Sequence, residues 1–199
     1  MLRIDIVQAD IDRMTAAAGA TGRQIEQARA NALRKMRAPI RAAVRKAVAK
    51  ARRIPERAMD GRIFSSEVPA GAEELKVWIG TRNIDLFAAG TPRQTKAGVT
   101  VGRLRYPGAF IARIYSEREQ VWIRLRSRHY DPELYPTRHR PGDNGLAELR
   151  GRFPVVRAAI PIDDIVQKVL EDGEEGFRQQ FMKIFAHELD YYVNIRGMH

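Results

Sequence analysis

The chain has 199 residues, no cysteine and a formal net charge of +11. Its length suits one domain, and the absence of cysteine excludes disulfides and thiolate metal sites. No apolar run approaches the ~20 residues of a membrane span, and the first residues lack the apolar core of a signal peptide. The basic excess favours a polyanion or an acidic protein surface as partner. We expect a cytoplasmic protein that does not bind a membrane.

The N-terminal segment, residues 1–20, is expected to hold a short strand and a short helix. Leu2, Ile4 and Ile6 alternate with charged residues, which is the period of a strand. Asp10 can then cap a helix that ends near Gly19.

Residues 21–54 are expected to form one long basic helix. Small apolar residues recur at steps of three and four from Ile25 to Ala51, giving a narrow, Ala-rich stripe. Pro39 lies inside this pattern, and because proline removes one helix hydrogen bond, we expect a kink or break near it.

The polar side of this helix carries a run of basic residues with few acids. Two hypotheses fit it: contact with DNA or with an acidic partner, or a solvated face that keeps an Ala-rich helix soluble. The residues predicted to make the contact are Arg34, Lys35, Arg37, Arg41, Arg45, Lys46, Arg52 and Arg53.

Residues 55–162 are expected to form a β-rich core on one antiparallel sheet of about four to six strands. Short apolar runs separated by glycine and proline predict the strands, and residues 110–126 predict a hairpin. In its second strand, alternation places Val121 and Ile123 on a core face, and Trp122 and Arg124 on the other. The basic stretch 90–98 and the Pro- and Gly-rich stretch 127–151 are predicted to be irregular loops.

Residues 163–199 are expected to form a C-terminal helix. Asp163 and Asp164 suit its positive N-terminal end, and Gly173 and Gly176 are expected to break or bend it. The whole chain is therefore predicted to be one α+β domain, in which a long N-terminal helix and a C-terminal helix pack on a small antiparallel sheet.

No pattern predicts catalysis, a cofactor or a metal site. His187-Glu188 is half of a zinc-protease motif, but Tyr191 stands where the second histidine belongs. His129 and His139 lie near acids without a spacing that fixes ligand geometry. Because no phosphate-binding loop or nucleophile elbow is present either, we expect the protein not to be an enzyme.

Three motifs occur in order along the chain. Residues 52–59 are a basic segment after the first long helix, and residues 103–113 are an extended basic segment with a Pro-Gly-Ala-Phe-Ile turn. Residues 153–162 are an apolar segment before the last helix. From about residue 20 to 193 this ordered set resembles the phage minor tail protein Z family, the tail completion proteins of long-tailed, lambda-type phages. Residues 130–151 depart from the family pattern.

The resemblance implies a structural virion protein, assembled in the host cytoplasm and located at the head-proximal end of the tail. It implies a homo-oligomeric ring, expected to be hexameric, that contacts the tail terminator, the tail tube or head-completion proteins. Such a ring would enable head–tail joining and let DNA pass, or hold the DNA end.

An assembly interface is predicted where aromatic and turn residues cluster, because aromatic residues concentrate at the centres of interfaces. The alternative is that the turn only fixes the start of a strand and that the C-terminal aromatics are plain core. The predicted interface residues are Tyr106, Pro107, Gly108, Phe110, Phe177 and Phe181.

The alternative function is a sequence-independent nucleic-acid-binding protein. Lys and Arg on a helix contact phosphates without reading bases, so such a protein would bind duplex with a steep salt dependence.

Overall fold

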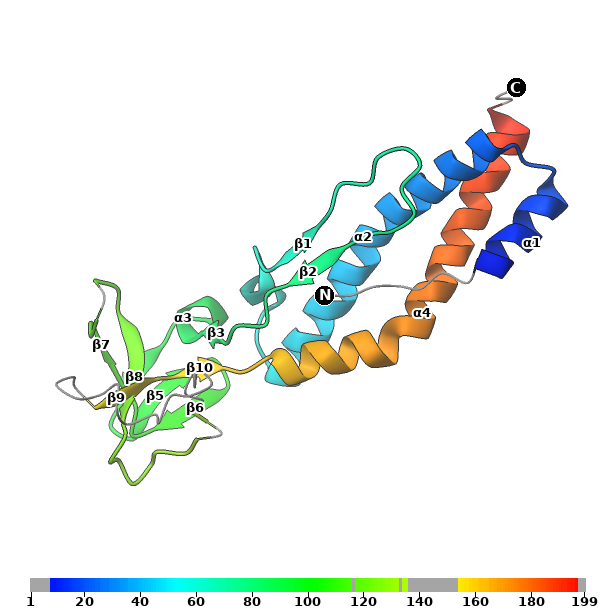
Figure 1. Cartoon of the computed structure of the whole chain (residues 1–199). Helices are drawn as coiled ribbons and strands as arrows, with labels where there is room; N and C mark the ends of the chain where they lie inside the picture. The colour runs from blue at the N-terminus through cyan, green and yellow to red at the C-terminus, as the bar shows by residue number, and fades with distance from the viewer. Residues whose placement is uncertain (1–7, 116, 133, 136–153, 197–199) are drawn as a thin grey trace, which may run out of the picture. The chain divides into compact units, whose positions relative to one another are not determined.

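The computed structural model describes residues 8–115, 117–132, 134–135 and 154–196 (Figure 1). The strand expected within residues 1–20 and most of the loop expected at 127–151 lie outside the described residues. The fold is α+β, as predicted: long helices occur together with short antiparallel strands.

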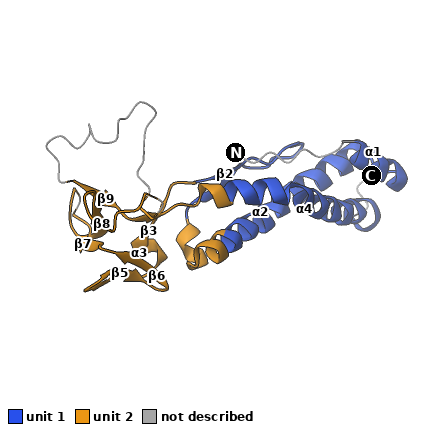
Figure 2. Cartoon of the chain, turned by 90° about the horizontal axis from the view of Figure 1, so that it is seen from below, with its two compact units in different colours: residues 1–47, 61–80, 166–199 blue, residues 48–60, 81–165 orange. Residues whose placement is uncertain are grey.

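The chain, expected to be one domain, divides into two compact units (Figure 2). Unit 1 comprises residues 1–47, 61–80 and 166–199, and unit 2 comprises residues 48–60 and 81–165. Most of each long helix belongs to unit 1, while the last turn of the first and the start of the second belong to unit 2.

The helices of unit 1 surround an apolar core, with one small strand pair added to them. Their bounds are α1 Gln8–Ala18, α2 Gly22–Arg52, α4 Asp163–Asp190 and a terminal π-helix Tyr191–Ile195, with strands β1 Ile63–Ser65 and β2 Val77–Ile79.

Helix α2 begins with a capping box. The hydroxyl of Thr21 accepts a hydrogen bond from the Gln24 backbone N–H, and the Gln24 side-chain oxygen accepts one from the Thr21 backbone N–H at 2.8 Å. The helix then runs through Pro39 without interruption. The expected break at Pro39 is therefore absent.

Helix α4 likewise continues through Gly173 and Gly176 without a break, and it bends partway along its length (Figure 1). The Phe177 ring lies where a side chain at Gly173 would stand, 2.9 Å from the position of a Cβ atom. Gly173 thus makes room for an aromatic ring one turn later in the same helix.

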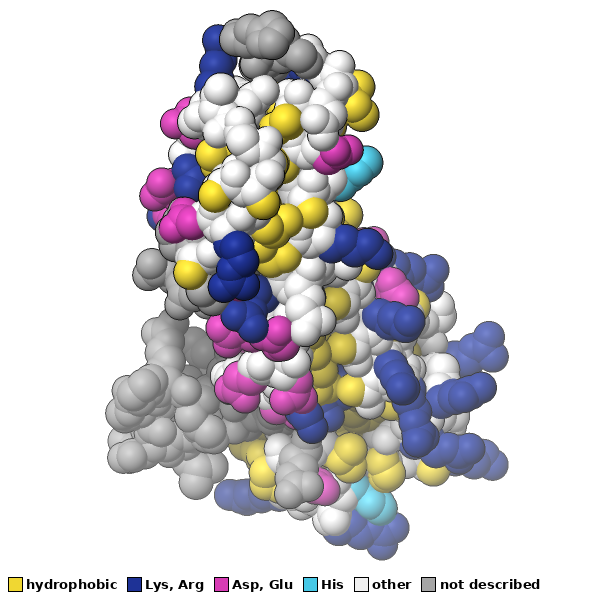
Figure 3. Space-filling model, turned by 90° about the vertical axis from the view of Figure 1, so that its right-hand side faces the viewer, with side chains coloured by type: hydrophobic (Ala, Val, Ile, Leu, Met, Phe, Trp, Pro, Cys, Tyr) yellow, Lys and Arg dark blue, Asp and Glu magenta, His cyan; other side chains and the backbone are white. Residues whose placement is uncertain are grey.

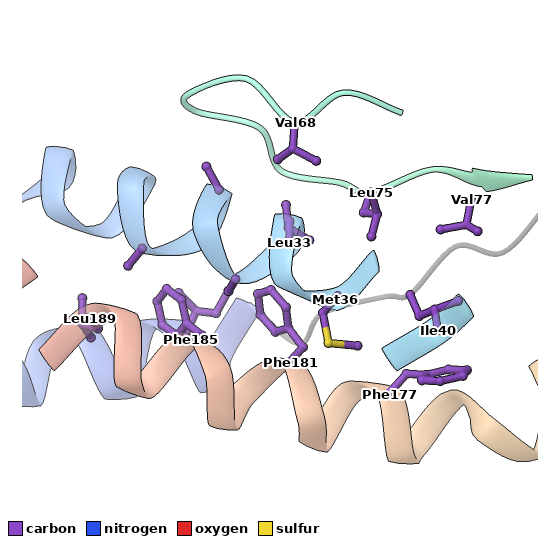
Figure 4. Packing of buried hydrophobic residues seen from close by; sticks show 14 of the residues in the cluster. Leu33, Met36, Ile40, Val68, Leu75, Val77, Phe177, Phe181, Phe185 and Leu189 are labelled. Atoms are coloured by element: carbon purple, nitrogen blue, oxygen red, sulfur yellow. The ribbon is translucent and has the colours of Figure 1, made fainter. Parts of the chain in front are cut away.

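The unit 1 core lies between α2, α4 and the β1–β2 segment (Figure 4). The Phe181 and Phe185 rings of α4 stack with centroids 6.0 Å apart. The other labelled core side chains are Leu33, Met36 and Ile40 from α2, Val68, Leu75 and Val77 from the β1–β2 segment, and Phe177 and Leu189 from α4.

Unit 2 is built from short elements. These are the 3-10 helix Glu56–Met59, β3 Ile84–Asp85, α3 Leu86–Ala89, β4 Arg93–Thr95, β5 Gly98–Val101, β6 Leu104–Pro107, β7 Phe110–Ala112, β8 Gln120–Arg124, β9 Val155–Arg157 and β10 Ala159–Ile160.

The strands do not form the single sheet that was expected. Across the described residues they form four small antiparallel sheets, ordered β1–β2, β10–β3, β4–β5–β6 and β7–β8–β9. The Pro107-Gly108 turn separates β6 from β7, because Gly108 has a φ of 69°, which leaves the extended region of a strand. Strand β7 then pairs with β8 instead.

The hairpin predicted at residues 110–126 is confirmed, since Ile111 lies opposite Val121 in an antiparallel pair. Both faces of β8 are covered: Trp122 is buried alongside Val121 and Ile123, and its indole N–H donates to the Ala112 carbonyl at 3.0 Å. The prediction of an irregular loop at 90–98 is wrong in part, because β4 pairs with β5 there.

Candidate functional site

Two of the predicted basic residues hold the β1–β2 segment onto α2. Arg34 donates from Nε to the Val68 carbonyl at 2.9 Å and from Nη1 to Asn31 Oδ1 at 2.7 Å. One turn later, Arg37 donates from Nη2 to the Ser66 carbonyl. These bonds satisfy carbonyl groups of a segment with little regular structure, so both guanidinium groups already have a role within unit 1.

Lys35 takes part in a polar network between α2 and α4. It pairs with Glu188, whose side chain is only 7% exposed. Asn31 donates to the second oxygen of Glu188 at 3.1 Å and to the Tyr192 hydroxyl at 2.8 Å. A buried carboxylate needs such partners to remain stable in a low-dielectric interior. Glu188, which belongs to the half zinc-protease motif, therefore has a structural role in this network between α2 and α4.

Arg52, in unit 2, is also occupied. Its Nε donates to the Pro161 carbonyl at 2.6 Å, and its Nη2 contacts both carboxylate oxygens of Asp164 at 2.7 and 2.8 Å. It therefore ties the end of α2 to the start of α4 within unit 2.

The remaining predicted basic residues differ in exposure. Arg41, Lys46 and Arg53 are exposed, whereas Arg45 is half-buried. Within the part of the chain that the structure describes, no ion pair is formed by Arg41, Lys46 or Arg53. Of the predicted basic residues, these three therefore have exposed side chains that can contact a partner.

The Pro-Gly turn of the predicted interface is the centre of a packed junction. The Tyr106 ring is buried and meets the buried Tyr135 ring edge-on at 5.9 Å. The Tyr135 hydroxyl donates to the Pro107 carbonyl at 2.9 Å. Gly98 lies so close to the Tyr106 carbonyl oxygen that a Cβ there would be 2.2 Å from it. Only Pro107 in this junction is fully exposed, and Gly108 and Phe110 are half-buried.

Burial also changes the acidity of the two tyrosines. It raises the pKa of Tyr106 and of Tyr135 from 10 to about 12, because the phenolate loses hydration inside unit 2. Both groups are therefore neutral hydrogen-bonding or packing groups at physiological pH.

Phe177 and Phe181 lie in the unit 1 core, 8% and 1% exposed. Their side chains are not presented to a partner in this structure, which favours the alternative that they are plain core.

Two surfaces stand out whose residues are not among the predicted contact residues. Phe64 and Trp78 lie directly opposite each other in the β1–β2 pair and are 59% and 45% exposed. Alternation along the strands could have indicated their exposure, because the neighbouring Ile63, Val77 and Ile79 pack inward against the core.

The second surface is basic and lies on the β4–β5–β6 sheet. Residues 86–116 contain no acid, while they contain Arg93, Lys96, Arg103, Arg105 and Arg113. All five are exposed, and Arg113 pairs with Glu119. That long acid-free stretch was the sequence signal that could have found them. On the molecular face shown in Figure 3, many of the Lys and Arg side chains gather along the lower right, whereas Asp and Glu side chains lie mainly at the left and centre.

Within the described residues, no group of three or more His, Cys, Asp and Glu is placed to hold a metal ion. None of the helices in the described part of the chain combines the length and apolarity that crossing a membrane requires.

No protein-family model, curated protein or solved structure matches this chain.

Proposed function

We propose that the chain is a structural tail completion protein of a long-tailed phage. Copies would form a homo-oligomeric ring, expected to be hexameric, at the head-proximal end of the tail. The ring would contact the tail terminator, tail tube or head-completion proteins, and would enable head–tail joining and DNA passage. The observation that carries this proposal is the ordered set of three motifs at residues 52–59, 103–113 and 153–162.

The places of these motifs in the fold support reading them as a set. All three belong to unit 2. The first ends α2 and begins the 3-10 helix, the second includes β6 and β7, and the described part of the third includes β9 and β10. Motifs that are far apart in sequence thus contribute to one compact unit.

The exposed aromatic pair supports a role in assembly. Large apolar side chains exposed together on a small protein mark contact surfaces, and aromatic residues are enriched among the anchors of such contacts. Phe64 and Trp78 form such a pair in unit 1. An assembly protein needs partner contacts of this kind and no catalytic site.

The proposal is tested by quantitative mass spectrometry of purified virions, in which this chain is counted against the portal and tail-tube proteins. A closed ring built from one kind of head-to-tail contact predicts a fixed stoichiometry, here about six copies per particle. Absence of the chain from particles would contradict the proposal.

A second candidate function, sequence-independent nucleic-acid binding, is favoured by a separate observation. The acid-free stretch 86–116 gives unit 2 an exposed basic surface that is not neutralised by its own sequence neighbours.

A further inference from the structure

The outer face of the β4–β5–β6 sheet carries a fixed row of polar and basic side chains. Arg93 lies opposite Thr100, and Thr100 lies opposite Arg105, so the three share one face. The residues that alternate with them, Val99 and Tyr106, are buried on the other face. Because the inner face is packed, the outward direction of Arg93 and Arg105 is fixed by the sheet.

Further positive charge lies at both ends of this sheet. Lys96 is in the turn between β4 and β5, and Arg103 is in the turn between β5 and β6. All four basic residues are exposed, and within the described part of the chain none of them forms an ion pair. Their charge is therefore available to a ligand.

We propose that this basic sheet face, defined by Arg93, Lys96, Arg103 and Arg105 around Thr100, binds the phosphate backbone of duplex nucleic acid without reading its sequence. Neighbouring strands lie about 4.8 Å apart, so the backbones of Arg93 and Arg105 are separated by roughly 10 Å. Long arginine side chains on that spacing reach separate phosphates, and the planar guanidinium matches phosphate oxygens with two donors.

The chemistry of the face favours a duplex backbone over single-stranded nucleic acid. Single-strand binders stack bases on exposed aromatic rings, whereas the side chains on the outer face of this sheet are those of Arg93, Thr95, Thr100, Arg105 and Pro107. The aromatic side chain of β6, Tyr106, points into unit 2. Thr100 adds a hydroxyl, which is a common neutral donor to phosphate.

This inference rests on the second candidate function, nucleic-acid binding, and names the site for it, but it does not depend on the tail assignment. It concerns a face of one compact unit and can be tested in solution on the whole chain, without particles. It also places phosphate contact on a sheet, whereas the basic helix α2 uses much of its predicted set for internal bonds.

The test compares the wild type with Arg93→Gln/Arg105→Gln by fluorescence anisotropy, using a labelled short DNA duplex of mixed sequence and a series of salt concentrations. Each lost phosphate contact lowers the slope of log affinity against log salt by about one. We therefore expect the slope of the double variant to fall by about two, with weaker binding at low salt.

Two matched variants separate the face from overall charge. Lys168→Gln/Lys183→Gln removes the same charge from exposed positions of α4 in unit 1, and it is expected to bind as the wild type does. Arg93→Lys/Arg105→Lys keeps the charge and is expected to keep the salt slope. Circular dichroism checks that each variant is folded.

Three results would overturn the proposal. One is an unchanged salt slope in Arg93→Gln/Arg105→Gln, and another is an equal loss in the Lys168→Gln/Lys183→Gln control. The third is tighter binding of polyaspartate than of the duplex, lost in the same double variant, because the face would then be a site for an acidic protein.

Discussion

One arginine in the left-handed conformation ends the long helix α2. Arg53 has a φ of 54°, and the backbone N–H of the following Ile54 donates to the Ala49 carbonyl at 3.1 Å. This is the hydrogen bond of a Schellman motif, in which the left-handed position is usually glycine. Ile54 is buried and Pro55 follows, so the helix is stopped firmly even though the residue at the turn is not the preferred one.

Replacing Arg53 with glycine should therefore stabilise the protein. Glycine adopts positive φ without steric cost, and we expect the free energy of unfolding to rise by roughly 0.5–1 kcal/mol. The control is Arg57→Gly, which removes the same charge in the 3-10 helix that follows and should be destabilising. Denaturant unfolding measures both, and a loss of stability in Arg53→Gly as large as in the control would contradict this account.

The two buried tyrosines of unit 2 make its stability sensitive to high pH. Their pKa values are raised from 10 to about 12 in the folded state, so the folded state holds these protons more tightly than the unfolded state. The stabilising contribution is complete below pH 10 and is lost as the pH rises toward 12.

We expect Tyr106→Phe/Tyr135→Phe to be less stable at neutral pH, because the Tyr135 bond to the Pro107 carbonyl is lost, at a cost of about 1 kcal/mol. The variant should also lose less stability than the wild type in the alkaline window. Unfolding followed by tryptophan fluorescence in a Trp78→Phe background, where Trp122 of the same unit is the only tryptophan, measures this. Parallel losses in the two proteins would show that other groups cause the alkaline unfolding.

At the scale of elements, we expect opposite effects on stability when the two glycines of α4 are replaced by alanine. Gly176 has no other atom within 4 Å of a Cβ position, so alanine there should add helix propensity, worth about 1 kcal/mol. At Gly173 the same change would push against the Phe177 ring, which is buried in the core. We expect Gly173→Ala to give no gain, or a loss.

Thermal unfolding of the two single variants tests this pair directly. Because both substitutions are glycine to alanine in one helix, propensity cancels in the comparison and the difference measures the contact with Phe177. Equal stabilisation by both changes would mean that the ring moves aside without cost.

The helices could be predicted from the sequence, because the apolar stripe of α2 and the aromatic stripe of α4 repeat with the helical period. The effect of Gly173 could not, since it depends on where the Phe177 ring lies in the folded core. The division of strands into separate sheets was also hidden, because pairing depends on turns such as Pro107-Gly108 rather than on the strands themselves.

The contacts of the candidate site residues could likewise be predicted from the sequence only in part. The charge of α2 is plain in the sequence, but the carbonyl groups that occupy Arg34 and Arg37 belong to Val68 and Ser66, about 30 residues further on. Pairings at that separation are set by tertiary structure. The acid-free run around Arg93 and Arg105, in contrast, was visible, and only the sheet register was needed to place these two on one face.

At the scale of the whole molecule, the exposed pair Phe64 and Trp78 tests the assembly role. If the proposed ring forms through this surface, Phe64→Ser/Trp78→Ser should remain folded, because a cross-strand pair is worth only about 0.2–1 kcal/mol, but should be reduced in virions. Complementation followed by mass spectrometry of particles measures the copies retained. Phe87→Ser, which changes an exposed aromatic residue of unit 2, is the control. Full incorporation of the double variant would exclude this surface from assembly.

The chain crosses between the two compact units four times, because unit 1 is assembled from three stretches and unit 2 from two. The last stretch of unit 1 begins at residue 166, after every residue of unit 2 has been made. On the ribosome, the apolar side of α2 therefore cannot pack against the Phe177, Phe181 and Phe185 rings until all of unit 2 has been synthesised. Unit 2 can therefore fold before unit 1, although the first residues of unit 1 are synthesised before those of unit 2. Neither unit can be obtained by simply truncating the gene.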